Sequence, residues 1–164
     1  MEFEPETSFE LFSVVRRPVS QQDMAIGLHV SQLVADGGTL QIGIGSIGDA
    51  IAQSLLLRHT KNSDYLALVK ASPFASSGSE HHRAPFETGL YAVTEMLVGG
   101  ILELFQGGII RREVDGAAIH AGFFLECRDF YRSLRDMPAS QRAKIVMMPV
   151  SFTNSLYTDE AAKR

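Results

Sequence analysis

The sequence lacks the features that mark several common classes of protein. Its 164 residues include a single cysteine, Cys127, so a disulfide within the chain is excluded and a reducing compartment is expected. No apolar run approaches the roughly 20 residues that a membrane-spanning helix needs. Four glutamates occupy the first ten positions, where a secretory signal would be basic and then apolar. We therefore expect a cytoplasmic protein without a membrane span.

The chain also lacks an excess of positive charge. It has 15 basic and 19 acidic residues, a net charge of −4, which argues against a general nucleic-acid binder. We expect the basic pairs Arg16-Arg17 and Arg111-Arg112 to be solvated. The apolar content of 45% is enough for the core of one domain. The last residues, 158–164, resemble the start of a helix with no apolar face, so we expect a piece of a longer protein.

The most informative stretch is GTLQIGIGSIGDAI, which begins at residue 38. Its first part predicts a short buried strand, and its glycines predict a turn that leads into a helix. Ser46 is the expected N-cap, with Asp49 completing a capping box. Glycine lets a ligand approach the backbone closely, and the first amides of a helix lack partners. We therefore expect part of a binding site at the turn, formed by Gly43, Ile44 and Gly45.

The rest of the chain follows the order of an α/β protein. Ser20 and Asp23 predict the start of a first helix, with Ile26, Val30, Leu33 and Val34 on its buried face. Further elements are expected as strands at 65–69, 89–94 and 144–150, helices at 97–106 and 126–135, and a strand pair at 109–124 around an Asp-Gly turn. The prediction is a mostly parallel sheet flanked by helices. Residues 1–17 would form a lead-in, and residues 18–164 an incomplete domain.

Residues 43–48 also match the pattern GxGxxG of dinucleotide-binding domains, and they stand between a predicted strand and a predicted helix. The acidic residue that such domains carry at the end of the second strand is missing, because Lys70 occupies that place. A nicotinamide-dependent enzyme and a purely structural turn are both compatible with the turn alone.

Other candidate residues allow two interpretations each. Glu95 follows directly on a predicted strand, where a carboxylate either takes part in chemistry or is stabilised by the dipole of the next helix. The pair His81-His82 lies in a long polar loop, but no further ligands stand at a suitable spacing, so no metal site is expected. Three more histidines and the cysteine are expected to be structural or surface residues: His29, His59, His120 and Cys127.

Three segments together resemble the acetyl-CoA hydrolase/transferase family. They are DGGTLQIGIGSIGDAI at 36–51, VTEM at 93–96 and PVSFTN at 149–154. The resemblance runs from Pro18 to the end of the chain and covers the first part of the family's C-terminal domain. It implies a CoA-transferase-like (NagB/RpiA-like) α/β fold.

The resemblance also implies a site and a substrate. Glu95 would be the nucleophile, which takes up CoA as a glutamyl-CoA thioester, and residues 43–45 would line the same cleft. Asn154 would either contact substrate or cap a turn. The substrates would be acetyl-CoA or a similar short acyl-CoA and a carboxylate, with no permanently bound cofactor. A homo-oligomer is expected, because missing segments would leave apolar faces bare.

The chain departs from the family in two respects. Leu97 and Val98 follow the T-E-M segment where the family often has Asp-Gly, so a helper carboxylate is in doubt. The family's N-terminal domain and a downstream glycine-rich segment are absent, so the chain would hold half a cleft. Two alternatives therefore stay open: an NAD(P)-binding domain that uses the glycine turn, and a non-catalytic module that retains the fold.

Overall fold

The computed structural model describes residues 11–72 and 82–151. Its centre is a four-stranded sheet with the strand order β1-β2-β3-β4, in which all three pairings are parallel. The strands are β1 (Thr39–Leu40), β2 (Tyr91–Leu97), β3 (Ile119–Phe124) and β4 (Ile145–Met147). A parallel sheet with helical crossovers confirms the predicted α/β fold.

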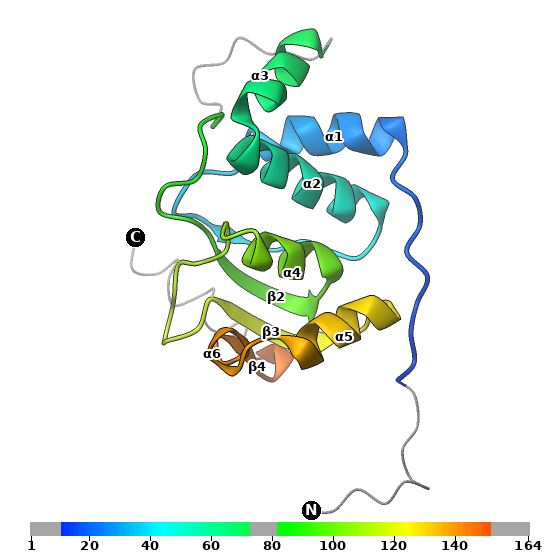
Figure 1. Cartoon of the computed structure of the whole chain (residues 1–164), viewed down its shortest axis with the longest axis vertical. Coiled ribbons are helices and arrows are strands. Elements are labelled where there is room, and N and C mark those ends of the chain that lie inside the picture. The colour runs from blue at the N-terminus through cyan, green and yellow to red at the C-terminus, as the bar shows by residue number, and fades with distance from the viewer. Residues whose placement is uncertain (1–10, 73–81, 152–164) are drawn as a thin grey trace, which may run out of the picture.

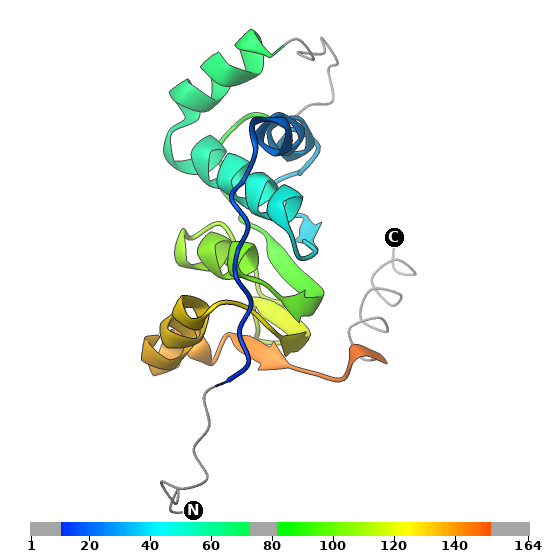
Figure 2. The same ribbon diagram turned by 90° about the vertical axis from the view of Figure 1, so that its right-hand side faces the viewer.

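Six helices are present in the described ranges: α1 (Gln21–Ser31), α2 (Ser46–Thr60), α3 (Asn62–Ala71), α4 (Gly99–Gln106), α5 (Arg128–Asp136) and α6 (Ala139–Arg142). Helices α4 and α5 cover one face of the sheet (Figures 1 and 2). Helix α2 packs on α4, and α1 and α3 pack on α2. None of these helices has the length and apolar character needed to cross a bilayer.

The start of α1 follows the predicted pattern. Ser20 is the N-cap, and its hydroxyl accepts a hydrogen bond from the amide of Asp23 at 3.1 Å. The Asp23 carboxylate in turn accepts from the Ser20 amide at 3.2 Å. This reciprocal pair is a capping box, which satisfies two donors that the helix itself leaves unpaired.

The predicted buried face of α1 is only partly right. Val34 packs against the core and Val30 is half-buried, but Ile26 and Leu33 are 43% and 60% exposed. Gly27 and Ser31 are buried. Helix α1 crosses α2 so closely that a Cβ added to Gly27 would lie 2.5 Å from the carbonyl of Ala50. Small residues therefore form this contact, and large apolar residues are displaced to its edges.

A similar close contact joins α2 to α4. A Cβ added to Gly100 would lie 2.9 Å from the Cβ of Ala52. Ala50 and Ala52 both belong to α2 and are fully buried. Helix α2 is thus held between α1 and α4 through residues with little or no side chain.

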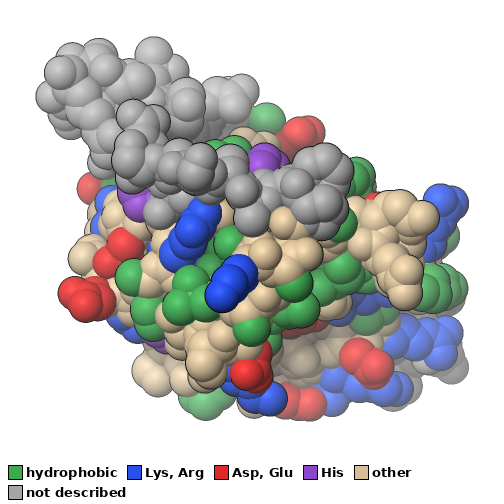
Figure 3. All heavy atoms as spheres, turned by 90° about the horizontal axis from the view of Figure 1, so that it is seen from above, with side chains coloured by type: hydrophobic (Ala, Val, Ile, Leu, Met, Phe, Trp, Pro, Cys, Tyr) green, Lys and Arg blue, Asp and Glu red, His purple; other side chains and the backbone are tan. Residues whose placement is uncertain are grey.

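The predicted strand at 65–69 is a helix, α3. Tyr65 and Val69, four positions apart, are buried, whereas Leu66 and Leu68 are 41% and 50% exposed. This burial has the period of a helix, which a run of five apolar residues does not reveal by itself. On the surface seen from the α3 end, hydrophobic side chains are mixed with lysines and arginines (Figure 3).

The predicted strand pair at 109–124 is only partly right. The Asp115-Gly116 turn exists, with φ of 50° and 79°, and is closed by one antiparallel bridge between Val114 and Ala117. The chain then joins the sheet as β3, parallel to β2, so no hairpin forms. The outer strands are also shorter than predicted, and residues of β4 are only half-buried or exposed.

Arg58 is fully buried and has carbonyl partners in place of a carboxylate. It donates to Ser31 O and Val34 O at the end of α1, at 3.0 and 2.7 Å, and to Ala84 O at 2.6 Å. Its guanidinium carbon lies 4.3 Å from the ring centroid of Phe86. One buried cation therefore joins the C-terminal end of α1 to the segment that leads into β2.

Asp36 organises the same junction from the surface. Its carboxylate accepts hydrogen bonds from the amides of Glu87, Thr88 and Gly89 at 3.0, 2.8 and 2.8 Å. Partial burial opposes ionisation of this carboxyl, but the backbone donors outweigh it and lower its pKa below 3.8.

We predict that Gly27→Ala destabilises the protein. The added methyl group would overlap the Ala50 carbonyl, and overpacking of this kind costs about 1–3 kcal/mol, more than the roughly 1 kcal/mol gained from helix propensity. Urea unfolding measures the change. The control Gln22→Ala, exposed on the same helix, should change the free energy of unfolding by less than about 0.5 kcal/mol. An unchanged or higher stability of Gly27→Ala would contradict the close crossing of α1 and α2.

Asp36→Asn should remove a pH-dependent part of the stability. The folded state lowers the pKa of this carboxyl, so its contribution is complete above about pH 4 and is lost as the pH falls further. Wild type should therefore unfold at a higher temperature than Asp36→Asn near pH 7, and the gap should narrow towards about pH 2. Asp64→Asn, at an exposed position in α3, is the control. A gap that stays constant with pH would refute the role given to Asp36.

Candidate active site

The glycine turn and Glu95 lie at the same edge of the sheet. Strands β1 and β2 are parallel, with Leu40 opposite Ala92. Gly43 and Glu95 each follow this pair by three residues, Gly43 in the turn beyond the end of β1 and Glu95 within β2. Carboxyl ends of adjacent parallel strands are a common place for ligand sites in α/β proteins. That residues 43–45 line one cleft with Glu95 stays a prediction.

The turn itself is built differently from the prediction. Gly45, and not Ser46, is the N-cap of α2, and no side chain caps the helix. Gly45 has a φ of 119°, which side-chain-bearing residues rarely adopt, and a Cβ at Gly48 would overlap the carbonyl oxygen of Gly43. The first regular bond of the helix runs from the Asp49 amide to Gly45 O at 3.1 Å. The turn therefore presents backbone to its surroundings with little side-chain cover.

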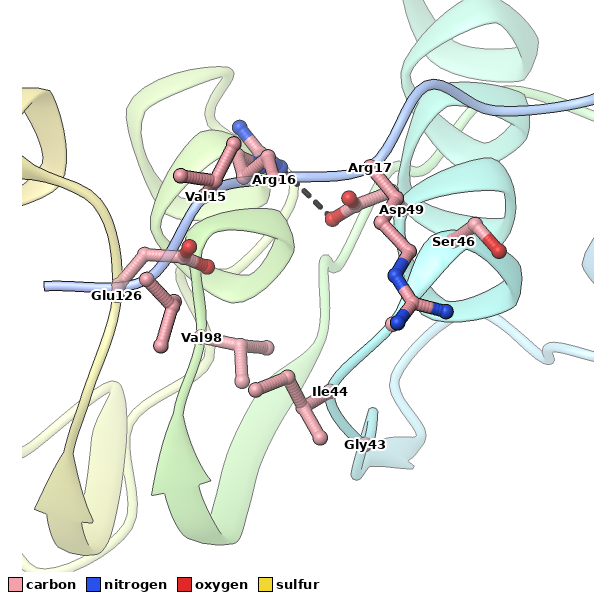
Figure 4. A pocket seen from close by; sticks show the side chains of 11 residues that line it. Val15, Arg16, Arg17, Gly43, Ile44, Ser46, Asp49, Val98 and Glu126 are labelled. Carbon is pink, nitrogen blue, oxygen red and sulfur yellow. Dashed lines mark hydrogen bonds and ion pairs between the residues drawn. The ribbon is translucent and has the colours of Figure 1, made fainter.

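A pocket of about 160 Å³ lies beside this turn (Figure 4). Its wall includes the predicted binding residues Gly43, Ile44 and Gly45, and Val98 from the segment that follows β2. The other lining residues are Val14, Val15, Arg16, Arg17, Ser46, Asp49 and Glu126. The pocket is thus formed by the starts of two helices, the residues before α5, and an extended segment that precedes α1.

Glu95 is exposed in β2 and does not line this pocket. Along a strand, side chains alternate between faces, so Glu95 is expected on the same face as Tyr91 and Val93. Ala92 belongs to the core beneath the helices, but so does Leu97, two residues after Glu95, so alternation does not assign Glu95 to one face. The structure therefore brings the turn and Glu95 to one edge but does not place the Glu95 carboxylate in the pocket described here.

Arg16 is a site residue that the sequence prediction missed. We expected a solvated side chain, but it donates to Asp49 Oδ1 at 2.7 Å and to Glu103 Oε1 at 2.6 Å. The hydrogen bond to Asp49 raises the pKa of Arg16, burial opposes this, and Glu103 adds to the rise. The three residues are 33 to 87 positions apart, so no local pattern could have revealed the cluster.

Arg17 and Glu126 complete the wall of the pocket. The Arg17 side chain runs from the extended segment towards the turn (Figure 4). Glu126 is buried, and its carboxylate accepts from the amides of Gly99 and Cys127 at 2.9 and 3.1 Å. It therefore satisfies donors at the starts of both α4 and α5. A glutamate at the first position of a predicted helix was the available sequence signal.

Other predicted residues lie elsewhere. Asn154 and His81 fall outside the described residues, and His82 is exposed. His120 is buried, its Nδ1 lies 2.7 Å from the Tyr91 hydroxyl, and burial lowers its pKa. Within residues 11–72 and 82–151, no group of three or more His, Cys, Asp or Glu side chains could hold a metal ion.

Comparison of sequences finds a similar CoA transferase. The chain is 26% identical over 147 residues to a succinyl-CoA:cyclohexane-1-carboxylate CoA transferase of Geobacter metallireducens. The match covers 88% of this chain and 26% of that protein. No model of a known protein family matches the chain.

Comparison of structures finds the same fold in RipA from Yersinia pestis, with a TM-score of 0.60 and 20% identity over 89% of this chain and 27% of RipA. A RipA variant with one glutamate replaced by alanine gives a TM-score of 0.59 and 19% identity, over 89% and 26% of the two chains. The chain spans about a quarter of the length of the proteins it matches. These comparisons agree with a CoA-transferase-like fold, and none points to acetyl-CoA hydrolases in particular.

Proposed function

We propose that this chain is part of a CoA transferase or acyl-CoA hydrolase in which Glu95 is the nucleophile. The observation that carries the proposal is an exposed carboxylate near the end of β2, three residues after Ala92, which pairs with the last residue of β1 before the glycine turn. The similarity to a CoA transferase over 88% of the chain supports the class of reaction. Acetyl-CoA or another short acyl-CoA is the proposed donor, and the protein is proposed to act as a homo-oligomer.

The proposed reaction proceeds through two covalent states of Glu95. Its carboxylate attacks the thioester carbonyl, the C–S bond breaks, and CoA leaves as a thiolate while a mixed anhydride remains on Glu95. The thiolate then attacks the Glu95 carbonyl carbon. This releases the acyl group as a carboxylate and leaves a glutamyl-CoA thioester. A second carboxylate reverses these steps in transfer, and water takes its place in hydrolysis.

The backbone of the turn would support this chemistry. Negative charge develops on the carbonyl oxygen of the thioester during each attack, and preorganised amide donors stabilise such charge. Gly43 and Gly45 each leave open space where a Cβ would stand, so a thioester could approach the backbone there. Glu95 does not line the pocket beside the turn, so its side chain would have to reach the same thioester from outside that pocket.

The surface near this edge indicates that more polypeptide completes the site. Val15, Ile44 and Ile47 are exposed apolar residues of the extended segment, the turn and the first turn of α2. Because the matched proteins are about four times as long as this chain, we propose that the complete cleft needs a further domain or a second copy. Turnover by the isolated chain should accordingly be low.

The NAD(P)-binding alternative receives less support. A dinucleotide fingerprint needs an acidic residue at the end of a second strand about 20 residues after the glycines. At that distance the chain forms helix α3, and the next strand, β2, begins only at Tyr91. A non-catalytic module would retain the turn and the sheet and would form no covalent adduct on Glu95. Trapping of that adduct therefore separates the two remaining functions.

We predict that Glu95→Gln abolishes the covalent intermediate. The protein, purified with any chain that accompanies it, is mixed in turn with acetyl-, succinyl- and cyclohexanecarbonyl-CoA, and borohydride or hydroxylamine is added. Mass spectrometry should find Glu95 modified in wild type. In Glu95→Gln, acyl exchange should fall about a thousandfold or more, because an amide is a poor nucleophile.

Two further variants sharpen this test. Glu95→Asp keeps the carboxylate but shortens its reach, so exchange should be severely impaired and not restored to the wild-type rate. Glu87→Gln, at an exposed position before β2, should leave exchange unchanged. An unmodified Glu95 in wild type, or full activity of Glu95→Gln, would refute its role as nucleophile.

A further inference from the structure

An extended segment, residues 11–17, crosses the carboxyl edge of the sheet. It runs past the N-terminal ends of α2, α4 and α5, which all point to this side of the molecule (Figure 2). Its backbone is tied down at two points near α5. The Phe12 carbonyl accepts from the Tyr131 hydroxyl at 2.7 Å, and the Val14 amide donates to Glu126 O at 3.3 Å.

Arg16 makes the charged contacts of this segment. One guanidinium nitrogen bonds Asp49 in the first turn of α2, and the other bonds Glu103 in α4. The guanidinium also lies directly over Gly99, where a Cβ would be 3.1 Å from its carbon atom. A single side chain thus contacts the helix that begins at the glycine turn and the helix that follows Glu95.

Both contacts lie next to the groups of the proposed chemistry. Asp49 carries the amide that bonds Gly45 O, so its side chain and backbone connect Arg16 to the turn. Gly99 stands four residues after Glu95, and its amide bonds Glu126. Arg16 therefore lies between the glycine turn and the segment that follows β2, and it bonds the helix that comes after each of them.

We propose that Arg16 is a positioning residue that holds the glycine turn and the end of β2 in a fixed relation across the sheet edge. Arginine suits this role because its planar guanidinium donates to two carboxylates in different directions. A lysine would bring one point charge and could not keep both bonds in the same geometry. The catalytic meaning of this role depends on the proposed function, whereas its structural part depends only on the contacts described above.

The test compares Arg16→Met with Arg132→Met. Methionine keeps much of the length and apolar contact of the arginine stem and removes both ion pairs. Arg132 lies on α5 and pairs only with Asp129 on the surface among the described contacts, so it serves as the matched control. Thermal unfolding first establishes a temperature at which each variant is fully folded.

Amide hydrogen exchange then reports on positioning in the chain without any substrate. In Arg16→Met, the amides of Asp49 and Gly99 should exchange about ten to a hundred times faster, the range expected for loss of charged hydrogen bonds. Arg16→Lys should recover protection at one of the two sites at most. Unchanged exchange at both amides, or faster exchange at Val14 alone, would overturn the proposal.

The rate of Glu95 modification provides the second measurement. At saturating acyl-CoA, Arg16→Met should form the adduct about tenfold or more slowly, while the half-saturating concentration changes less than about threefold. An unchanged rate, with wild type forming the adduct, would overturn the proposal. If wild type forms no adduct, the proposed function fails, and hydrogen exchange alone decides whether Arg16 positions the two segments.

Discussion

Close contact between helices through glycine and alanine is the constraint on which the rest of this structure depends. Helix α2 fits between α1 and α4 only because Gly27 meets Ala50 and Gly100 meets Ala52. The position of α2 in turn places its first residues, and hence the glycine turn, beside the end of β2. In a third close approach, Gly48 lies against the carbonyl of Gly43, so the first turn of α2 packs on the glycine turn that precedes it. The packing of the helices therefore sets the geometry of the candidate site.

The same edge of the sheet collects residues from distant parts of the chain. The turn contributes backbone, β2 contributes an exposed carboxylate, and the segment before α1 contributes a guanidinium that is paired with two helices. Glu126 adds a buried carboxylate that accepts from two helix starts. A parallel sheet makes such a collection possible because all its strands end on one side. In a protein that needs a nucleophile, amide donors and fixed geometry, this edge is where they can meet.

Sequence reasoning succeeded for several local signals, although the predicted Ser46–Asp49 capping box did not form. The Ser20–Asp23 capping box, the turn at Asp115-Gly116 and the glycine stop of α4 depend on residues within a few positions of one another, and the structure contains all three. It failed for α3, because a short apolar run suits either a strand or a helix until a neighbour decides. The buried face of α1 was predicted only in part, because large apolar residues were assumed to be inside and the contact with α2 instead required Gly27.

By itself, the sequence determined the class of fold, the presence of a glycine turn before a helix, and the location of a glutamate at the end of a strand. These follow from periodicity and from the conformational range of glycine, which act over a few residues. Only the tertiary structure decided that Glu95 is exposed in β2 outside the pocket beside the turn, and that Arg16 bridges α2 and α4. Those relations depend on strand register and helix packing, which join residues tens of positions apart and leave no local trace in the chain.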